Sequence, residues 1–159
     1  MNITFVLIFA ATVLIGLLAG ASLDQSIKQL PARYRIGLAA YSQYSRASDL
    51  GNGILFYGIL GVTAALLNIA AAIAAYLQNI PAQQLNLIYL GALLAVLHSL
   101  ATMQAAPLNF SQRKISANDE AALALVFDKF ARWQNIRCVL QVINFGVNLW
   151  ALVAYMKTG

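Results

Sequence analysis

Charged residues, cysteine and histidine are all scarce in this chain of 159 residues. Lysine, arginine, aspartate and glutamate together make up 9% of it, whereas soluble domains contain about 25%. The single cysteine, Cys138, excludes an intrachain disulfide and any zinc or iron–sulfur site that needs several cysteines. The single histidine, His98, excludes haem ligation by two histidines of one chain. A transition metal usually needs several such ligands, so we expect neither a metal nor a cofactor.

Familiar catalytic motifs are missing as well, because the sequence has no G-x-S-x-G, no Walker loop and no H-E-x-x-H. The net charge of +5 is not concentrated into a cluster that could follow a phosphate backbone, so we expect no nucleic-acid partner. What the chain has instead is apolar surface, with 61% hydrophobic residues and a mean hydropathy of +0.72. A soluble domain of this composition would expose large apolar patches, so the lipid bilayer is the expected environment.

Four apolar stretches are each long enough to cross ~30 Å of hydrocarbon, which takes ~20 helical residues. They run over residues 3–23, 53–77, 85–104 and 136–156, and Arg137 is their only charged residue. The first stretch could also be a signal peptide cleaved near Ala19-Gly20-Ala21, but it lacks a basic leader and its apolar run is too long. We expect it to be retained. The sequence therefore predicts one all-α domain over residues 1–159, an integral membrane four-helix bundle.

The basic residues predict the orientation of this bundle. Nine of the ten lie in residues 24–50 and 105–137, the connections before the second and fourth spans, and none lies in residues 78–84. The positive-inside rule then places both long connections in the cytoplasm and both termini outside. This arrangement is typical of a bacterial inner-membrane or endoplasmic-reticulum protein, and we expect a multi-pass protein of the bacterial inner membrane.

Both long connections are predicted to contain helix. We expect Pro31 to break the helix that leaves the first span. Residues 32–48 should then lie at the membrane interface, with four apolar or aromatic residues near one face. These four are Tyr34, Leu38, Tyr41 and Tyr44.

The fourth span should be the end of a much longer helix. Ser116 is a candidate N-cap, and Asp119 and Glu120 favour a helix start. No glycine or proline follows until Gly146, so one helix of about 40 residues, ~60 Å long, is predicted. Its cytoplasmic half needs a partner for its apolar positions, and the segment 32–48 is the candidate. These positions are Leu123, Val126, Phe127 and Phe130.

Polar residues recur along the fourth span at helical spacing. Arg137, Gln141, Asn144 and Asn148 follow one another at steps of four, three and four. Lipid-facing amides are costly, so this stripe should face the interior of the bundle. Counting the helical rise from the cytoplasmic side places Asn144 and His98 at a similar depth of ~10 Å. Further polar residues of the same half are Asp24, Asp49, Asn52, Thr102 and Asn109.

Two interpretations of these residues stay open. The amides can bridge helices without further function, while Arg137 extends to the interface. Alternatively, they line a pocket whose apolar walls hold a flat, partly polar aromatic molecule, with His98 moving a proton.

Two short sequences carry a resemblance to a known family. "HSLATMQAAPLN", followed after a charged insert by "RWQNIRCVLQVINF", resembles the anthrone-oxygenase-like family of four-span membrane proteins. Many members of that family are known only as a domain of unknown function. The matching features are Pro107-Leu108-Asn109 and the cluster Trp133, Asn135 and Arg137, and "GLLAGAS" at the end of the first span is also similar. The first connection departs from the family's pattern.

The resemblance implies cofactor-independent oxidation of an anthrone to an anthraquinone. On this hypothesis His98 is the base, and Arg137 stabilises the negative charge that develops. The matched motif implies substrate contacts for Asn109, Trp133 and Asn135. The depth and the stripe of the fourth span add Asn144 and Gln141 as candidate binding residues.

Two other functions remain in competition with this hypothesis. The first is a non-catalytic membrane subunit that packs within a larger complex or with copies of itself, through glycine- and alanine-rich faces such as Gly16 and Gly20. The second is a carrier or channel for a small solute, although no inverted repeat is visible.

Overall fold

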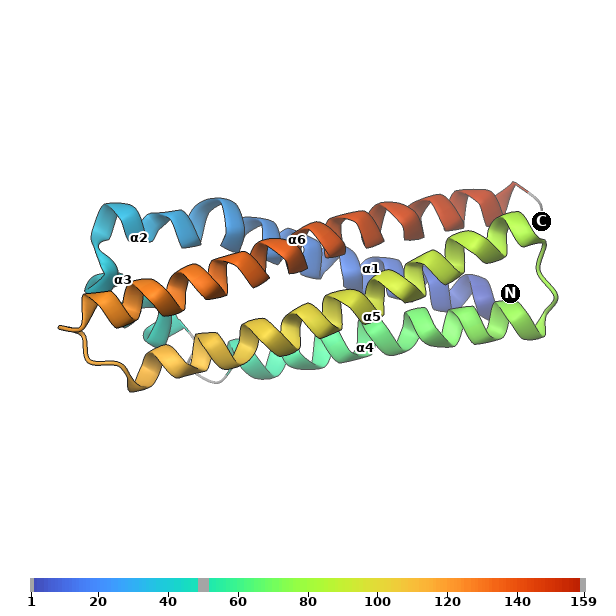
Figure 1. Ribbon diagram of the computed structural model, residues 1–159. Helices are drawn as coiled ribbons and strands as arrows, with labels where there is room; N and C mark the ends of the chain where they lie inside the picture. The colour runs from blue at the N-terminus through green and yellow to red at the C-terminus, as the bar shows by residue number, and fades with distance from the viewer. Residues whose placement is uncertain (1, 49–51, 158–159) are drawn as a thin grey trace.

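The computed structural model describes residues 2–48 and 52–157 as a bundle of long helices (Figure 1). The four long helices are α1 (Ile3–Asp24), α4 (Asn52–Leu77), α5 (Ala82–Ser111) and α6 (Glu120–Met156). A π-helical turn (Gln25–Gln29) joins α1 to α2 (Leu30–Ile36), and α3 (Leu38–Ser48) follows. A 3₁₀ turn (Gln112–Lys114) ends the α5 rod. No strand occurs within these two described ranges.

The predicted all-α architecture with four membrane-length helices is confirmed, because all four rods are long and apolar enough to cross a membrane. Each long helix contacts two neighbours, in the cyclic order α1, α4, α5 and α6. The start of α1 and the end of α6 lie at one end of the bundle, beside the α4–α5 link (Figure 1). There the Thr4 hydroxyl donates to Gln78 Oε1 at 3.0 Å. Helices α2 and α3 lie at the other end (Figure 1); which end faces the cytoplasm stays a prediction.

On α4, small side chains face the interior and large apolar ones face the outside. Ala64, Ala71 and Ala75 of α4 are buried, while Leu55 and Phe56 of the same helix are exposed. In a soluble domain the large apolar side chains face inward instead. Large apolar side chains on the outside suit a lipid-facing surface, and small ones on the inside let membrane helices approach closely. Gly16 is part of such a contact, since a Cβ there would lie 2.8 Å from the Phe145 ring; a Cβ on Gly20 would meet nothing within 4 Å.

Two predicted helix boundaries are wrong. Pro31 does not break the chain's helical course: it follows the π-helical turn Gln25–Gln29, and α2 continues through it to Ile36. The break comes at Gly37, whose φ of 83° favours glycine. The N-cap of α6 is Asp119, whose side chain accepts from Ala122 N at 3.0 Å, and not Ser116. Ser116 instead accepts from Asn118 N at 3.3 Å, within the preceding turn.

The predicted partner of the α6 extension is confirmed. The ring of Tyr41 in α3 meets that of Phe127 in α6 edge-on, with 4.9 Å between centroids. The turn at Gly37 separates α2 from α3, so Tyr34 is exposed while Tyr41 is buried, and the four predicted residues do not share one face. The core at this end comprises Leu30, Tyr41, Ala105, Leu123, Phe127 and Phe130.

Candidate functional site

The polar stripe of α6 faces the interior of the bundle, as predicted. Gln141, Asn144 and Asn148 expose 3%, 0% and 3% of their surface. The side chains therefore meet neighbouring helices rather than lipid, which would leave their amides unpaired.

The deeper part of the stripe holds helices together. Asn148 Nδ2 donates to Asn68 Oδ1 at 3.0 Å, and Asn68 Nδ2 donates to the Ala64 carbonyl at 2.8 Å. This bridge joins α6 to α4 across the bundle. It passes Gly91 of α5, where a Cβ would lie 2.5 Å from Asn148 Oδ1. This part of the stripe fits the interpretation as helix-bridging amides.

The shallower part of the stripe borders a cavity of about 480 Å³, within the ~300–1,000 Å³ range of small-molecule sites. Helices α1, α3, α4, α5 and α6 all contribute to its wall. Five of the polar residues singled out in the sequence line it: His98, Thr102, Asn109, Arg137 and Gln141. The aromatic rings of its lining belong to Tyr41, Tyr44, Tyr57, Phe110 and Phe130, besides the His98 imidazole.

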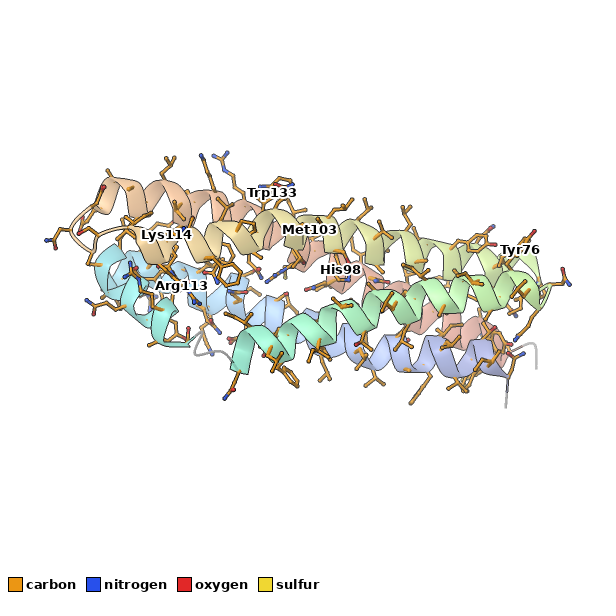
Figure 2. The ribbon with its side chains drawn as sticks, turned by 90° about the horizontal axis from the view of Figure 1, so that it is seen from below. Tyr76, His98, Met103, Arg113, Lys114 and Trp133 are labelled. Carbon is orange, nitrogen blue, oxygen red and sulfur yellow. The ribbon has the colours of Figure 1, made fainter. Side chains whose placement is uncertain are left out.

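His98 is the least satisfied side chain of this cavity. It exposes 2% of its surface, and neither ring nitrogen has a hydrogen-bond partner among the described residues. Thr102 donates to the His98 carbonyl at 2.8 Å, which does not occupy the ring. Figure 2 shows His98 directed inward between the long helices. A neutral imidazole offers one lone pair and one N–H, and the described residues use neither.

Arg137 is held in place by amides. Its Nη2 donates to Gln25 Oε1 at 3.2 Å and also to Gln134 Oε1. Gln134 Nε2 in turn donates to the Ser22 carbonyl and to Ser26 Oγ, both at 3.5 Å. These bonds fix the guanidinium without neutralising it.

No carboxylate pairs with Arg137 within residues 2–48 and 52–157. The ion pairs there join Lys28 to Asp24 at 2.7 Å and Arg33 to Asp128 at 3.0 Å. An arginine that lines a cavity without a counter-ion attracts a negatively charged or strongly dipolar oxygen, because its charge is weakly screened there. One turn further along α6, Gln141 Oε1 accepts from the Ser22 hydroxyl, which orders the α1 wall.

Three of the predicted site residues do not line the cavity. Trp133 and Asn135 are exposed on α6, and Figure 2 shows Trp133 at the outer margin of the bundle. Asn144 is fully buried between the cavity and the Asn68–Asn148 bridge, and its amide nitrogen and oxygen have no partner among the described residues.

The other polar residues assigned to this half by depth are also spread out. Asp24 accepts from Gln29 Nε2 at 2.6 Å and pairs with Lys28. Asn52 is exposed at the start of α4, and Asp49 falls outside the described residues. Neither Asp24 nor Asn52 lines the cavity.

The structure adds lining residues that the sequence analysis did not single out for a site. Ser22 lies near the end of α1, Gln25 begins the π-helical turn, and Ser45 lies in α3. Ile54, Tyr57, Gly58 and Gly61 of α4 also border the cavity. The α4 residues follow the i, i+3, i+4, i+7 spacing of one helical face. That spacing was visible in the sequence, but nothing there distinguished this face from the lipid-facing one.

The arrangement places a guanidinium, an imidazole, amides and aromatic rings around one cavity. Within the described ranges no three histidine, cysteine, aspartate or glutamate side chains gather as metal ligands do. Comparison of the chain with protein-family models, with curated proteins and with solved structures finds no match.

Proposed function

We propose that this multi-pass membrane protein binds a flat, partly polar aromatic molecule in the cavity and uses His98 to remove a proton from it. The observation that carries the proposal is the pair of groups left unused by the fold. The unpartnered imidazole of His98 and the guanidinium of Arg137, which has no carboxylate partner within the described ranges, border one cavity with aromatic walls. The reaction that we propose is the oxidation of an anthrone to an anthraquinone, which the resemblance to the anthrone-oxygenase-like family suggests.

The chemistry requires dioxygen as co-reactant and no cofactor. His98 takes a proton from the central CH₂ carbon of the anthrone, and the electron pair moves onto the carbonyl oxygen, which Arg137 stabilises as an oxyanion. The carbanion adds to dioxygen at that carbon, and the imidazolium returns its proton to the resulting peroxide. Loss of water then breaks the O–O bond and leaves a second carbonyl. Anthrone and dioxygen thus become anthraquinone and water.

A purely structural role explains the polar residues less well. A non-catalytic subunit is expected to satisfy its buried polar groups internally, as Asn68 and Asn148 do. His98 and Asn144 break that rule. A carrier would need a path to both ends of the bundle. Against this, the end that holds both termini has a core of buried apolar residues, which are Ile8, Ala71, Ala75, Ile88, Ala151 and Leu152.

The proposal is tested in phosphatidylcholine vesicles that contain the purified protein, with 1,8-dihydroxyanthrone as the probe. Oxygen uptake and anthraquinone absorbance are followed, and empty vesicles give the spontaneous rate. His98→Asn should lower the rate above background by about a hundredfold or more, because general-base catalysis typically contributes 10²–10⁴. Asn86→Ala, an exposed change on α5 outside the cavity, should leave it unchanged. Equal turnover by wild type and His98→Asn would reject His98 as the base.

We also propose that the end with α2 and α3 faces the cytoplasm, because the basic connections meet there. In a Cys138→Ser background, a membrane-impermeant maleimide applied to intact cells should label Gln83→Cys and not Asn118→Cys. Both positions are exposed, at opposite ends of the bundle. The reverse labelling would invert the orientation.

A further inference from the structure

The cavity has one wall that differs from the others, and we infer that this wall is a lateral portal through which a lipophilic aromatic ligand enters from the bilayer. The portal lies between the first half of α4 and the second half of α5. Ile54, Tyr57, Gly58 and Gly61 form its α4 side, and Ala106 and Phe110 form its α5 side. The identity of the ligand rests on the proposed function, whereas the position of the portal rests on geometry alone.

The portal residues belong to the cavity and to the outer surface at once. Ile54, Tyr57 and Phe110 border the cavity, yet they expose 39%, 49% and 40% of their surface. Gly58 is exposed as well. Residues on the opposite wall behave differently: Ser22 and Gln141 border the same cavity and are buried. The cavity therefore reaches the surface between α4 and α5.

The two portal glycines leave space that no neighbouring helix occupies. A Cβ added at Gly58 or Gly61 would meet nothing within 4 Å, whereas a Cβ at Gly16 or Gly91 would clash with a packed side chain. Close helix packing therefore does not account for glycine at these two positions, although glycine is unfavourable within a helix. The buried, unpartnered imidazole of His98 borders the same space, which is a second sign that a ligand fills it.

The surroundings of the portal select for a molecule that dissolves in hydrocarbon. No charged residue occurs from residue 52 to residue 112, and the exposed side chain of Met103, three residues before Ala106 on α5, is apolar. A charged or strongly hydrated ligand would lose its water there with nothing to replace it. A neutral fused-ring compound can pass between Tyr57 and Phe110 and then turn its polar edge toward Arg137.

Helix α3 borders the cavity at the end of the bundle. Ser42 donates to Gln112 Oε1 at 2.8 Å, and Arg46 Nη2 donates to the carbonyls of Gln112 and Ile115 at 2.9 and 2.7 Å. These bonds hold α3 over the cavity, to which it contributes Tyr41 and Tyr44.

Binding kinetics test the portal. The protein is placed in phosphatidylcholine nanodiscs, and association and dissociation of 1,8-dihydroxyanthraquinone are followed by the fluorescence of the dye, with empty nanodiscs as background. Gly58→Leu and Gly61→Leu should each slow association and dissociation by about tenfold while Kd changes by less than about threefold, because a narrowed passage hinders both directions, whereas a lost contact acts on dissociation. The matched control is Gly20→Leu, an exposed glycine with open space around its Cβ that does not line the cavity, and it should keep both rates.

Each outcome decides between alternatives. Unchanged association in both portal variants, or equal slowing in Gly20→Leu, overturns the portal. Faster dissociation alone would make the two glycines part of a binding wall and would also overturn it. Wild-type protein that binds the dye with the predicted variant effects, yet does not oxidise 1,8-dihydroxyanthrone, keeps the portal and rejects the oxidation. Wild-type protein that binds no dye rejects both the portal and the proposed ligand class.

Discussion

Gly91 is the position where one added methyl group should cost this bundle most. A Cβ at Gly91 would lie 2.5 Å from Asn148 Oδ1, 3.3 Å from Asn68 Oδ1 and 3.6 Å from Asn144 Oδ1. Asn68 Oδ1 is the acceptor of the amide bridge between α4 and α6, and Asn148 Oδ1 belongs to the amide whose nitrogen is its donor. Gly91→Ala must therefore displace the bridge or push α5 away from the bundle.

The magnitude follows from two opposing contributions. Forcing a methyl group into a packed interior costs about 1–3 kcal/mol, and an interhelical hydrogen bond in a membrane protein contributes ~0.6 kcal/mol. Against this, alanine is favoured over glycine within a helix by about 1 kcal/mol. A control glycine with open space receives only the favourable part. Gly91→Ala should therefore be less stable than such a control by about 2–3 kcal/mol.

The assay is the free energy of unfolding of the purified protein in mixed micelles, from titration with dodecyl sulfate followed by circular dichroism. Gly146→Ala on α6 is the control, because its Cβ meets nothing within 4 Å. Asn148→Ser shortens the side chain that the methyl group strikes, so it should restore part of the loss in a double-mutant cycle. If Gly91→Ala is as stable as Gly146→Ala, the close contact at the centre of the bundle does not exist.

Three other substitutions test the packing with the same measurement. Gly37→Ala should lower the free energy of unfolding by about 1–3 kcal/mol through backbone strain alone, since φ is 83° and its Cβ would meet nothing within 4 Å; no change would contradict the turn between α2 and α3. Gly16→Ala should be destabilising because its Cβ lies 2.8 Å from the Phe145 ring, and Phe145→Leu should partly rescue it; a neutral result would separate α1 from α6. Asn144→Leu should raise the free energy of unfolding by about 1–2 kcal/mol, because it removes a buried amide without a partner among the described residues; a decrease would show that a partner satisfies that amide.

The helices were largely predictable because lipid imposes a simple rule on sequence. A chain in hydrocarbon must satisfy its backbone within each helix, so a long uncharged stretch is a strong signal. The predicted span 53–77 became α4, Asn52–Leu77. The predicted span 85–104 lies within α5, which continues through Pro107 to Ser111. The predicted helix end at Pro31 and the predicted helix start at Ser116 were wrong. The preference of these two residues for a helix boundary is weaker than the effect of the turns next to them.

The site was predictable only in part. Helical spacing alone indicated that Gln141, Asn144 and Asn148 face inward, and the structure confirms it. The same spacing could not separate the paired Asn148 from the unpartnered Asn144, since that depends on Asn68 of another helix. Trp133 and Asn135 were named from a short motif, and the exposed surface of α6 carries both.

The amino-acid sequence by itself determined that the chain suits a lipid environment, that it has four membrane-length helices and that the polar face of the last helix points inward. Each of these follows from the free energy of transferring side chains and backbone from water into lipid. Only the tertiary structure decided which polar groups pair and which stay available. That choice depends on the distances between helices: Gly91 lets the Asn68–Asn148 bridge form, whereas α4 and α5 leave His98 beside a cavity. Such distances are set jointly by several helices, and no single stretch of sequence records them.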